Sequence, residues 1–194
     1  MTALGFFGKL PAVGDFVNRG IDRAQMKAVD AWLQLGLTEL AQRDAQWLDH
    51  YLIAPVWCFA VPAGQWSEAA HYGALMASVD RVGRYFPLLV IGDRRELLAD
   101  RQALHGHLRA LAGAMPEVLW ERLTPEVFVE RLQHLADREP GGVRALPSAL
   151  QRFNPEGELS AWWTEASPEQ PGRELSHVGR PDAGLLRQLF SAAE

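Results

Sequence analysis

Three short apolar segments follow one another near the middle of the chain, at residues 56–61, 72–79 and 86–91. Each has the length of a β-strand and is bounded by proline, glycine or polar residues, as strands are. The connections between them are shorter than the dozen or so residues that a crossover between parallel strands needs, so neighbouring strands must run antiparallel. This succession predicts an antiparallel sheet at the centre of the fold.

Helical periodicity flanks these strands on both sides in the sequence. Apolar residues recur every three or four positions over residues 23–43, where Asp22 is available as the N-cap, and again over residues 97–111. Thr124 followed by Pro125 predicts the start of a further helix. The remaining expected elements are strands at 4–8 and 159–164, a short helix near 47–51, a loop over 143–157 and a terminal helix over 182–192.

These elements predict an α/β fold with a mixed, largely antiparallel central sheet flanked by helices on both faces, which is a three-layer sandwich. The chain has 194 residues, about the size of one large domain. No internal repeat, low-complexity segment or shift in composition marks a linker. We therefore expect residues 1–194 to form a single domain.

The charge and apolar content exclude several classes of protein. A formal net charge of -5 argues against a dedicated nucleic-acid-binding protein, which would carry a basic face. No apolar run approaches the ~18–20 residues that cross a bilayer, and the N-terminus lacks the pattern of a secretory signal. We expect a cytoplasmic protein without membrane insertion, in which the single cysteine, Cys58, is a buried and inert strand residue.

Two segments, residues 5–16 and 78–88, place charged side chains among residues typical of a core. Removing a carboxylate or a guanidinium from water is costly unless a partner compensates. We therefore expect five charged side chains to converge on one cluster: Lys9, Asp15, Asp80, Arg81 and Arg84. Two interpretations stay open, an ion-pair network that fixes a turn between strands, or a recognition site for an acidic or phosphorylated group.

The sequence carries no complete catalytic or metal-binding motif. Gly8-Lys9 is not a phosphate-binding loop, because Leu10 stands where that loop needs a hydroxyl. His105 and His107 are two residues apart on a predicted helix with no third ligand nearby, and we expect them to face solvent. No serine lies in a nucleophile elbow. The sequence thus predicts no catalytic residue, no metal and no cofactor.

Consecutive tryptophans in the last predicted strand are candidates for an interface. Trp162 and Trp163 must face opposite sides of the sheet, so one can lie in the core while the other is exposed as an anchor for a partner. Four other tryptophans fall on apolar faces and are expected to pack in the interior: Trp32, Trp47, Trp57 and Trp120.

Several motifs in this chain resemble, in the same order, the TagF/ImpM family of type VI secretion-associated proteins. They are GFFGKLP at 5–11, GDF at 14–16, WLQ at 32–34, YLIAPVW at 51–57, SVDRVGRYFPL at 78–88 and SAWWT at 160–164. The chain departs from the family pattern at Ala77, where proline is frequent, and at Arg180, which interrupts a Gly-Leu-Pro motif. Neither departure changes the charged positions.

The resemblance implies a cytoplasmic accessory protein that represses the type VI apparatus after translation, without enzymatic activity, by contact with a forkhead-associated scaffold protein. Two other classes of function stay open beside it. The charged cluster can hold an anionic small ligand in a sensor or an enzyme. The chain can also be a structural subunit of the secretion assembly. The sequence sets no oligomeric state.

Overall fold

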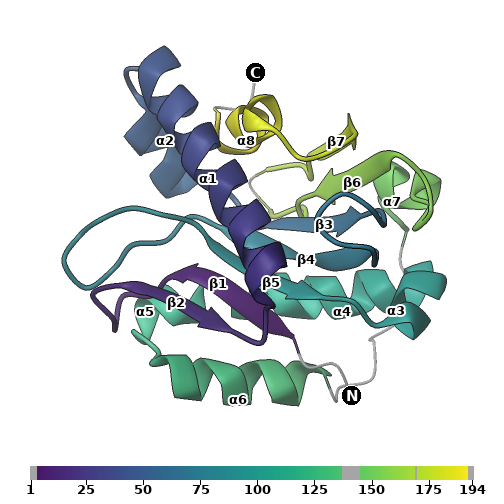
Figure 1. The fold of residues 1–194 in the computed structure, drawn as a ribbon, viewed down its shortest axis with the longest axis horizontal. Coiled ribbons are helices and arrows are strands. Elements are labelled where there is room, and N and C mark those ends of the chain that lie inside the picture. The colour runs from purple at the N-terminus through teal and green to yellow at the C-terminus, as the bar shows by residue number, and fades with distance from the viewer. Residues whose placement is uncertain (1–3, 137–144, 169, 192–194) are drawn as a thin grey trace.

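The computed structural model describes residues 4–136, 145–168 and 170–191. Its strands form one sheet in the order β2-β1-β5-β4-β3-β6-β7, and each described pair of neighbours is antiparallel (Figure 1). The strands are β1 Gly5–Lys9, β2 Phe16–Arg19, β3 Trp57–Val61, β4 His71–Met76, β5 Leu88–Gly92, β6 Leu159–Trp163 and β7 Glu174–Val178. The predicted antiparallel succession of three strands is confirmed, because β3, β4 and β5 lie side by side in chain order.

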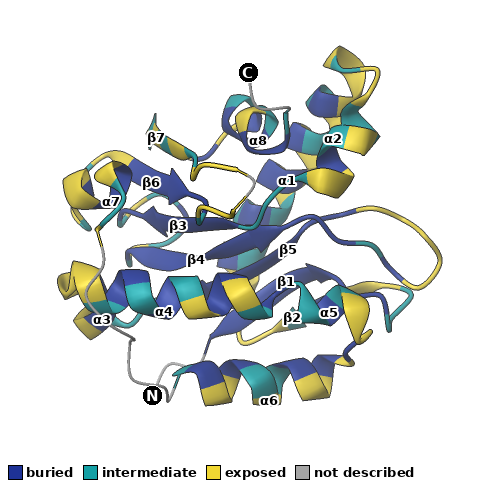
Figure 2. Ribbon diagram, turned by 180° about the vertical axis from the view of Figure 1, so that it is seen from behind, coloured by how far each residue is buried: buried dark blue, intermediate teal, exposed yellow. Residues whose placement is uncertain are grey.

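Helices cover both faces of this sheet (Figures 1 and 2). One face carries α1 Arg23–Arg43, α2 Trp47–Ile53 and α8 Ala183–Phe190. The other face carries α3 Arg95–Ala99, α4 Arg101–Ala114, α5 Glu117–Trp120, α6 Pro125–Ala136 and α7 Ser148–Arg152. The predicted α/β sandwich of three layers is confirmed. In the described part of the chain, no helix has the length and apolar character needed to cross a membrane.

The alternation of side chains along the strands divides the interior into two cores. In β6, Trp162 contacts Trp32 of α1 on one face, and Trp163 lies near His105 of α4 on the other. The prediction that the two tryptophans face opposite sides is therefore confirmed. Both are fully buried, so the expected exposed interface anchor is absent at these positions. The reason is that helices cover β6 on both faces, which the sequence of the strand does not reveal.

Two strands and two helices lie where the sequence predicted none, one of these helices being the four-residue α5. β2 has only four residues, and β7 alternates exposed and half-buried positions at the edge of the sheet, so neither contains an apolar run. α7 falls inside the stretch 143–157 that was expected to be a loop, of which residues 143 and 144 lie outside the described residues. The predicted terminal helix ends at Phe190, and Ala192 also lies outside the described residues.

The helices that begin with a predicted cap do so as expected. The Asp22 carboxylate accepts hydrogen bonds from the backbone N–H groups of Ala24 and Gln25 at the start of α1, at 2.8 and 3.0 Å. α6 begins at Pro125, directly after Thr124. Local capping chemistry therefore sets both boundaries.

The two main helices of one face, α1 and α8, approach each other closely at Gly36. A Cβ atom added at Gly36 would lie 2.6 Å from the Cβ atom of Leu186. This Leu186 atom is bonded directly to the backbone of α8, so it cannot move aside unless the helix moves. Two tryptophans, one in α1 and one in β3, hold α8 in place through hydrogen bonds. Trp32 Nε1 donates to the Asp182 carbonyl at 2.7 Å, and Trp57 Nε1 donates to the Leu189 carbonyl at 2.8 Å.

We expect Gly36→Ala to lower the free energy of unfolding by ~1–3 kcal/mol, because overpacking forces α1 and α8 apart. Urea denaturation measures this change. Gly113→Ala is the matched control, since Gly113 lies in α4 with no atom within 4 Å of an added Cβ. That variant should gain up to ~1 kcal/mol from helix propensity. Equal effects of the two substitutions would contradict the packing argument.

Candidate functional site

The charged residues that the structure brings together lie at one end of the sheet, where β1 and β4 both end. Gly8 of β1 has a φ of 139°, and an added Cβ there would lie 2.9 Å from the Leu88 Cα atom. Only glycine allows this conformation and this approach without strain. β1 therefore passes close to the start of β5, and Lys9 lies beside the loop that joins β4 to β5.

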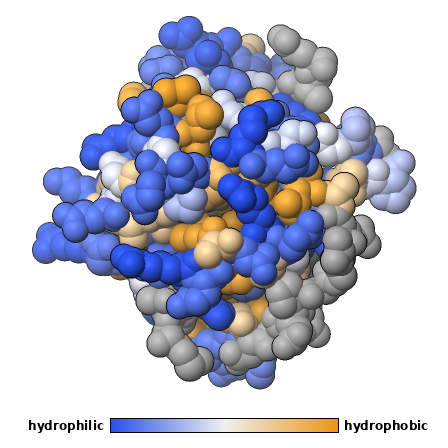
Figure 3. Space-filling model, turned by 90° about the vertical axis from the view of Figure 1, so that its right-hand side faces the viewer, coloured by the Kyte–Doolittle hydropathy of each residue, from blue (hydrophilic) through white to orange (hydrophobic). Residues whose placement is uncertain are grey.

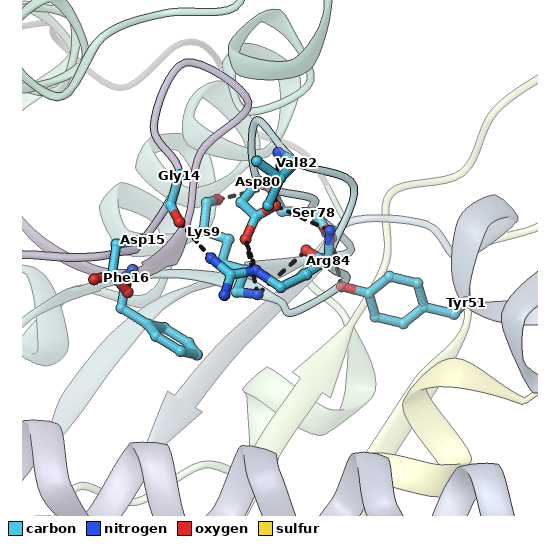
Figure 4. Close-up of polar contacts among 9 residues, drawn as sticks. All are labelled: Lys9, Gly14, Asp15, Phe16, Tyr51, Ser78, Asp80, Val82 and Arg84. Carbon is cyan, nitrogen blue, oxygen red and sulfur yellow. Dashed lines mark hydrogen bonds and ion pairs between the residues drawn. The ribbon is translucent and has the colours of Figure 1, made fainter.

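The Asp80 carboxylate is the centre of the site (Figure 4). Its Oδ2 atom is 3.1 Å from Lys9 Nζ and accepts a hydrogen bond from Arg84 Nε at 2.7 Å. Its Oδ1 atom accepts the backbone N–H groups of Val82 and Arg84, at 3.0 and 2.9 Å. The side chains of Lys9 and Asp80 are 6% and 0% exposed. Four donors thus compensate a carboxylate that is removed from water.

These contacts set the charge state of Asp80. Burial alone would raise the pKa of this carboxyl, but the hydrogen bonds from Arg84, Lys9 and Val82 favour the ionised form and outweigh it, so the pKa lies well below its ordinary value. The same residue closes the turn, because the Gly83 N–H donates to the Asp80 carbonyl at 3.1 Å, with Gly83 at a φ of 86°. Asp80 is therefore a fixed anion that organises its own loop.

Arg84 connects the buried pair to the surface. Its side chain is 58% exposed, although its Nε atom is held by Asp80. Its guanidinium also donates to the Gly14 carbonyl, which lies in the loop between β1 and β2 (Figure 4). The carbonyl of Arg84 accepts from Lys9 Nζ at 3.4 Å. The guanidinium is thus held in one orientation while it remains accessible to a partner.

A second layer of contacts fixes the base of the loop. The Ser78 hydroxyl donates to the Lys9 carbonyl at 2.8 Å. The Tyr51 hydroxyl donates to the Ser78 carbonyl at 3.0 Å and accepts the Ser78 N–H at 2.9 Å. Phe16 lies under the Lys9 ammonium, 5.1 Å from the ring centroid, and packs edge to face against Phe86. Sequence reasoning missed Tyr51, because it lies 27 residues before Ser78 in an ordinary helical pattern.

The structure does not bring Asp15 and Arg81 into the network. Asp15 is exposed, and its carboxylate accepts the N–H of its neighbour Phe16. Arg81 is also exposed, its N–H donates to the Val13 carbonyl at 2.9 Å, and its guanidinium lies beside Gly14. Neither forms an ion pair with any described residue. Both stand on loops that reach solvent, so no desolvation cost forces them to pair, and the expected cluster of five contains three paired members.

Two expectations for α4 and α5 are wrong. His105 and His107 are both buried rather than exposed, because the stripe of α4 that packs on the sheet is wide enough to include them. His105 Nε2 lies 3.1 Å from Glu165 Oε1, and the His107 ring packs against Tyr72. Burial lowers the pKa of His107 to about 4. Trp120, expected in the interior, is 79% exposed.

Cys58 has the inert environment that the sequence predicts. It is fully buried in β3, and its thiol lies 3.5 Å from the Leu108 carbonyl. Burial raises the pKa of this thiol, which keeps it protonated. Among the described residues, no three His, Cys, Asp or Glu side chains are placed to hold a metal ion.

One contact of potentially catalytic residues escaped the sequence analysis. Ser67 Oγ and His71 Nε2 are 2.7 Å apart, and the Gln25 amide lies 3.0 Å from the same ring nitrogen. Burial lowers the pKa of His71. A serine nucleophile needs a base that a third group orients, and no carboxylate in the described ranges hydrogen-bonds to this ring. Ser67 Oγ also accepts the Ala69 N–H, so the contact fixes the β3–β4 loop.

Two cavities lie away from the charged network. A cavity of about 570 Å³ lies between α4 and α6 and is lined by apolar side chains such as Met115 and Phe128, with Arg131 among its polar lining residues. Arg131 is already paired with Glu117 and with Glu121. Another, of about 370 Å³, lies beside Glu165. Neither cavity is lined by Lys9, Asp80, Val82 or Arg84, which together are called the Asp80 network from here on.

Comparison with known proteins relates the chain to a protein family and to a solved structure. A family model described as the TagF N-terminal domain, type VI secretion system-associated, matches residues 5–138, which include the whole Asp80 network. The fold is similar to the crystal structure of PA0076 from Pseudomonas aeruginosa PAO1, with a TM-score of 0.78 and 27% sequence identity, over 99% of this chain and 96% of that chain. No curated protein matches the chain.

We expect Tyr51→Phe to lower the free energy of unfolding by ~1–3 kcal/mol, because it leaves the buried N–H of Ser78 without a partner and the Ser78 carbonyl with only the Phe86 N–H. Chemical denaturation measures the loss. Tyr85→Phe is the matched control, since Tyr85 is 37% exposed and packs against Tyr51 through its ring alone. The control should change stability by less than ~0.5 kcal/mol. A Tyr51→Phe variant as stable as wild type would contradict the assignment.

The lowered pKa of Asp80 predicts a specific loss of stability in acid. Its stabilising contribution is complete above the ordinary carboxyl pKa of about 3.9 and is lost as the pH falls toward the lower native value. The difference in urea midpoint between wild type and Asp80→Asn should therefore stay constant down to about pH 5 and shrink below about pH 4. For the exposed Asp15→Asn control, we expect almost no difference at any pH. A constant gap for Asp80→Asn down to about pH 3 would refute the argument.

Proposed function

Because the chain belongs to the TagF family of type VI secretion-associated proteins, we propose that it is a cytoplasmic, non-enzymatic regulator that represses type VI secretion after translation by binding a forkhead-associated scaffold protein. One observation carries this proposal. A buried Lys9–Asp80 pair holds the exposed guanidinium of Arg84 at the end of the sheet.

The geometry around Arg84 favours recognition of a partner. A long side chain normally loses conformational freedom when it is fixed at an interface, which weakens binding. Here Asp80 and the Gly14 carbonyl already fix the guanidinium, so most of that loss has occurred in the free protein. A planar guanidinium held in this way binds carboxylates and phosphates in a defined orientation.

The same contacts argue against catalysis at this site. A general base needs a pKa near the working pH. Asp80 accepts hydrogen bonds from Arg84 and Val82 and pairs with Lys9, so its lone pairs are occupied and its pKa is lowered. It is therefore a poor proton acceptor. This supports a binding role for the network.

An anionic small ligand is a second candidate, which the two exposed guanidiniums of Arg81 and Arg84 beside Gly14 favour. If such a ligand binds, saturation at about 100 times its Kd stabilises the protein by ~2.7 kcal/mol. We expect no thermal shift with a panel of nucleotides and phosphorylated metabolites. A reproducible shift that Arg84→Ala abolishes would favour the sensor over the regulator.

The central test is the affinity of the purified chain for the forkhead-associated scaffold protein, measured by titration calorimetry. We expect Arg84→Ala to weaken binding roughly tenfold or more, as loss of a central arginine does. Arg152→Ala is the control, because Arg152 is an exposed arginine on α7, at the far side of the molecule from the β4–β5 loop (Figure 1).

A thermal melt of each variant separates loss of contact from loss of fold. If Arg84→Ala is folded and binds the scaffold as tightly as wild type, Arg84 is not part of the contact. If the wild-type chain does not bind the scaffold at all, the proposed function is wrong.

A further inference from the structure

Trp120 is far more exposed than the tryptophans of the sheet. Its side chain is 79% exposed at the end of α5, while Trp57, Trp162 and Trp163 are fully buried. Val82, at the tip of the β4–β5 loop, is 64% exposed. Figures 1 and 2 both place α5 and this loop at the same end of the molecule. A single exposed apolar residue is normal, but here Val82 belongs to the loop that Asp80 organises, and Trp120 belongs to the helix at the same end of the molecule.

Hydrogen bonds join the residue that follows the C-cap of α5 to the loop between β1 and β2, and join this loop to the β4–β5 loop. The Arg122 guanidinium donates to the Pro11 carbonyl at 3.1 Å. Two residues further along the same loop, the Val13 carbonyl accepts the N–H of Arg81. Arg122 adopts a φ of 50°, a left-handed conformation that is uncommon for arginine and that directs the chain away from α5. The loop over residues 10–15 is therefore hydrogen-bonded both to Arg122, which follows α5, and to the β4–β5 loop.

The charge of this surface differs from that of the whole chain. The chain carries a net charge of -5, but Arg81, Arg84 and Arg122 all expose side chains here. Of the acids nearby, Glu117 and Glu121 are both paired with Arg131, and Asp15 has no ion-pair partner among the described residues. A locally basic surface on an acidic protein is complementary to an acidic partner and disfavours a second copy of this chain.

The geometry points to a docking surface, here called the Trp120 surface, formed by Trp120, Arg122, Arg81, Val82 and Arg84. We propose that an acidic surface of the scaffold protein docks there and receives the Trp120 ring in an apolar pocket. This inference rests on the proposed function and names the contact surface. Tryptophan and arginine side chains dominate binding energy at protein interfaces, and an exposed ring gains most when it is desolvated.

The opposite end of the molecule has a different character. Figure 3 shows that the side bearing α3 and α7 has hydrophobic patches interrupted by hydrophilic side chains. Val178 of β7, 66% exposed, lies on the edge strand opposite β2. Val178 therefore provides a control substitution, because replacing it removes exposed apolar area at the other edge of the sheet.

Binding of the scaffold protein to purified variants tests the inference. We expect Trp120→Ala to weaken affinity roughly tenfold or more, Trp120→Phe to retain most of it, and Val178→Ala to leave it unchanged. All three should keep the melting temperature of wild type, since the replaced side chains are exposed. The wild-type affinity should fall with salt, and Arg81→Glu should bind more weakly with a shallower salt dependence.

The outcomes separate the two proposals. If the wild-type chain binds and Trp120→Ala binds equally well, the Trp120 surface is wrong while the proposed function stands. If the wild-type chain does not bind, both are wrong. If sedimentation velocity shows that wild type self-associates and that Trp120→Ala abolishes this without affecting scaffold affinity, a second copy occupies the surface and the inference is overturned.

Discussion

The end of the sheet depends on the burial of one carboxylate. Asp80 is withdrawn from water, so every one of its contacts is needed to offset the loss of hydration. Lys9 comes from the end of β1, whereas Arg84 and Val82 come from the β4–β5 loop that Asp80 itself begins. The carboxylate thus holds together two segments that are distant in the sequence, since Lys9 and Arg84 lie 75 residues apart. The position of the exposed guanidinium follows from this arrangement.

The parts of the fold that the sequence predicted correctly are those governed by local rules. Short connections require β3, β4 and β5 to be antiparallel neighbours, and caps at Asp22 and Thr124 set helix starts. The pairing of Lys9 with Asp80 was also predictable, because charges embedded in apolar segments must find partners. In each case the prediction follows from the residues adjacent in sequence to the one concerned, even where the partner, as for Lys9 and Asp80, is distant in the chain.

The parts that it missed depend on what the rest of the chain covers. Asp15 and Arg81 stand in the same motifs as the buried charges, but their loops reach solvent, and only the tertiary structure distinguishes them. His107 is buried because α4 packs against the sheet along its length. Trp120 is exposed because it is the last residue of the four-residue helix α5, where no described element covers its side chain. β7 has no apolar run, since its position at the edge requires little burial on either face.

The site therefore separates the residues that maintain the fold from those that face solvent. Lys9 and Asp80 are sealed, so changes there act on stability first and on binding only through Arg84. Trp120 and Arg81 have almost no role in the interior, so they are free to vary with the partner without cost to folding. Under the proposed function this division matters, because the affinity of the surface for a partner can change while the buried network that positions the surface remains intact.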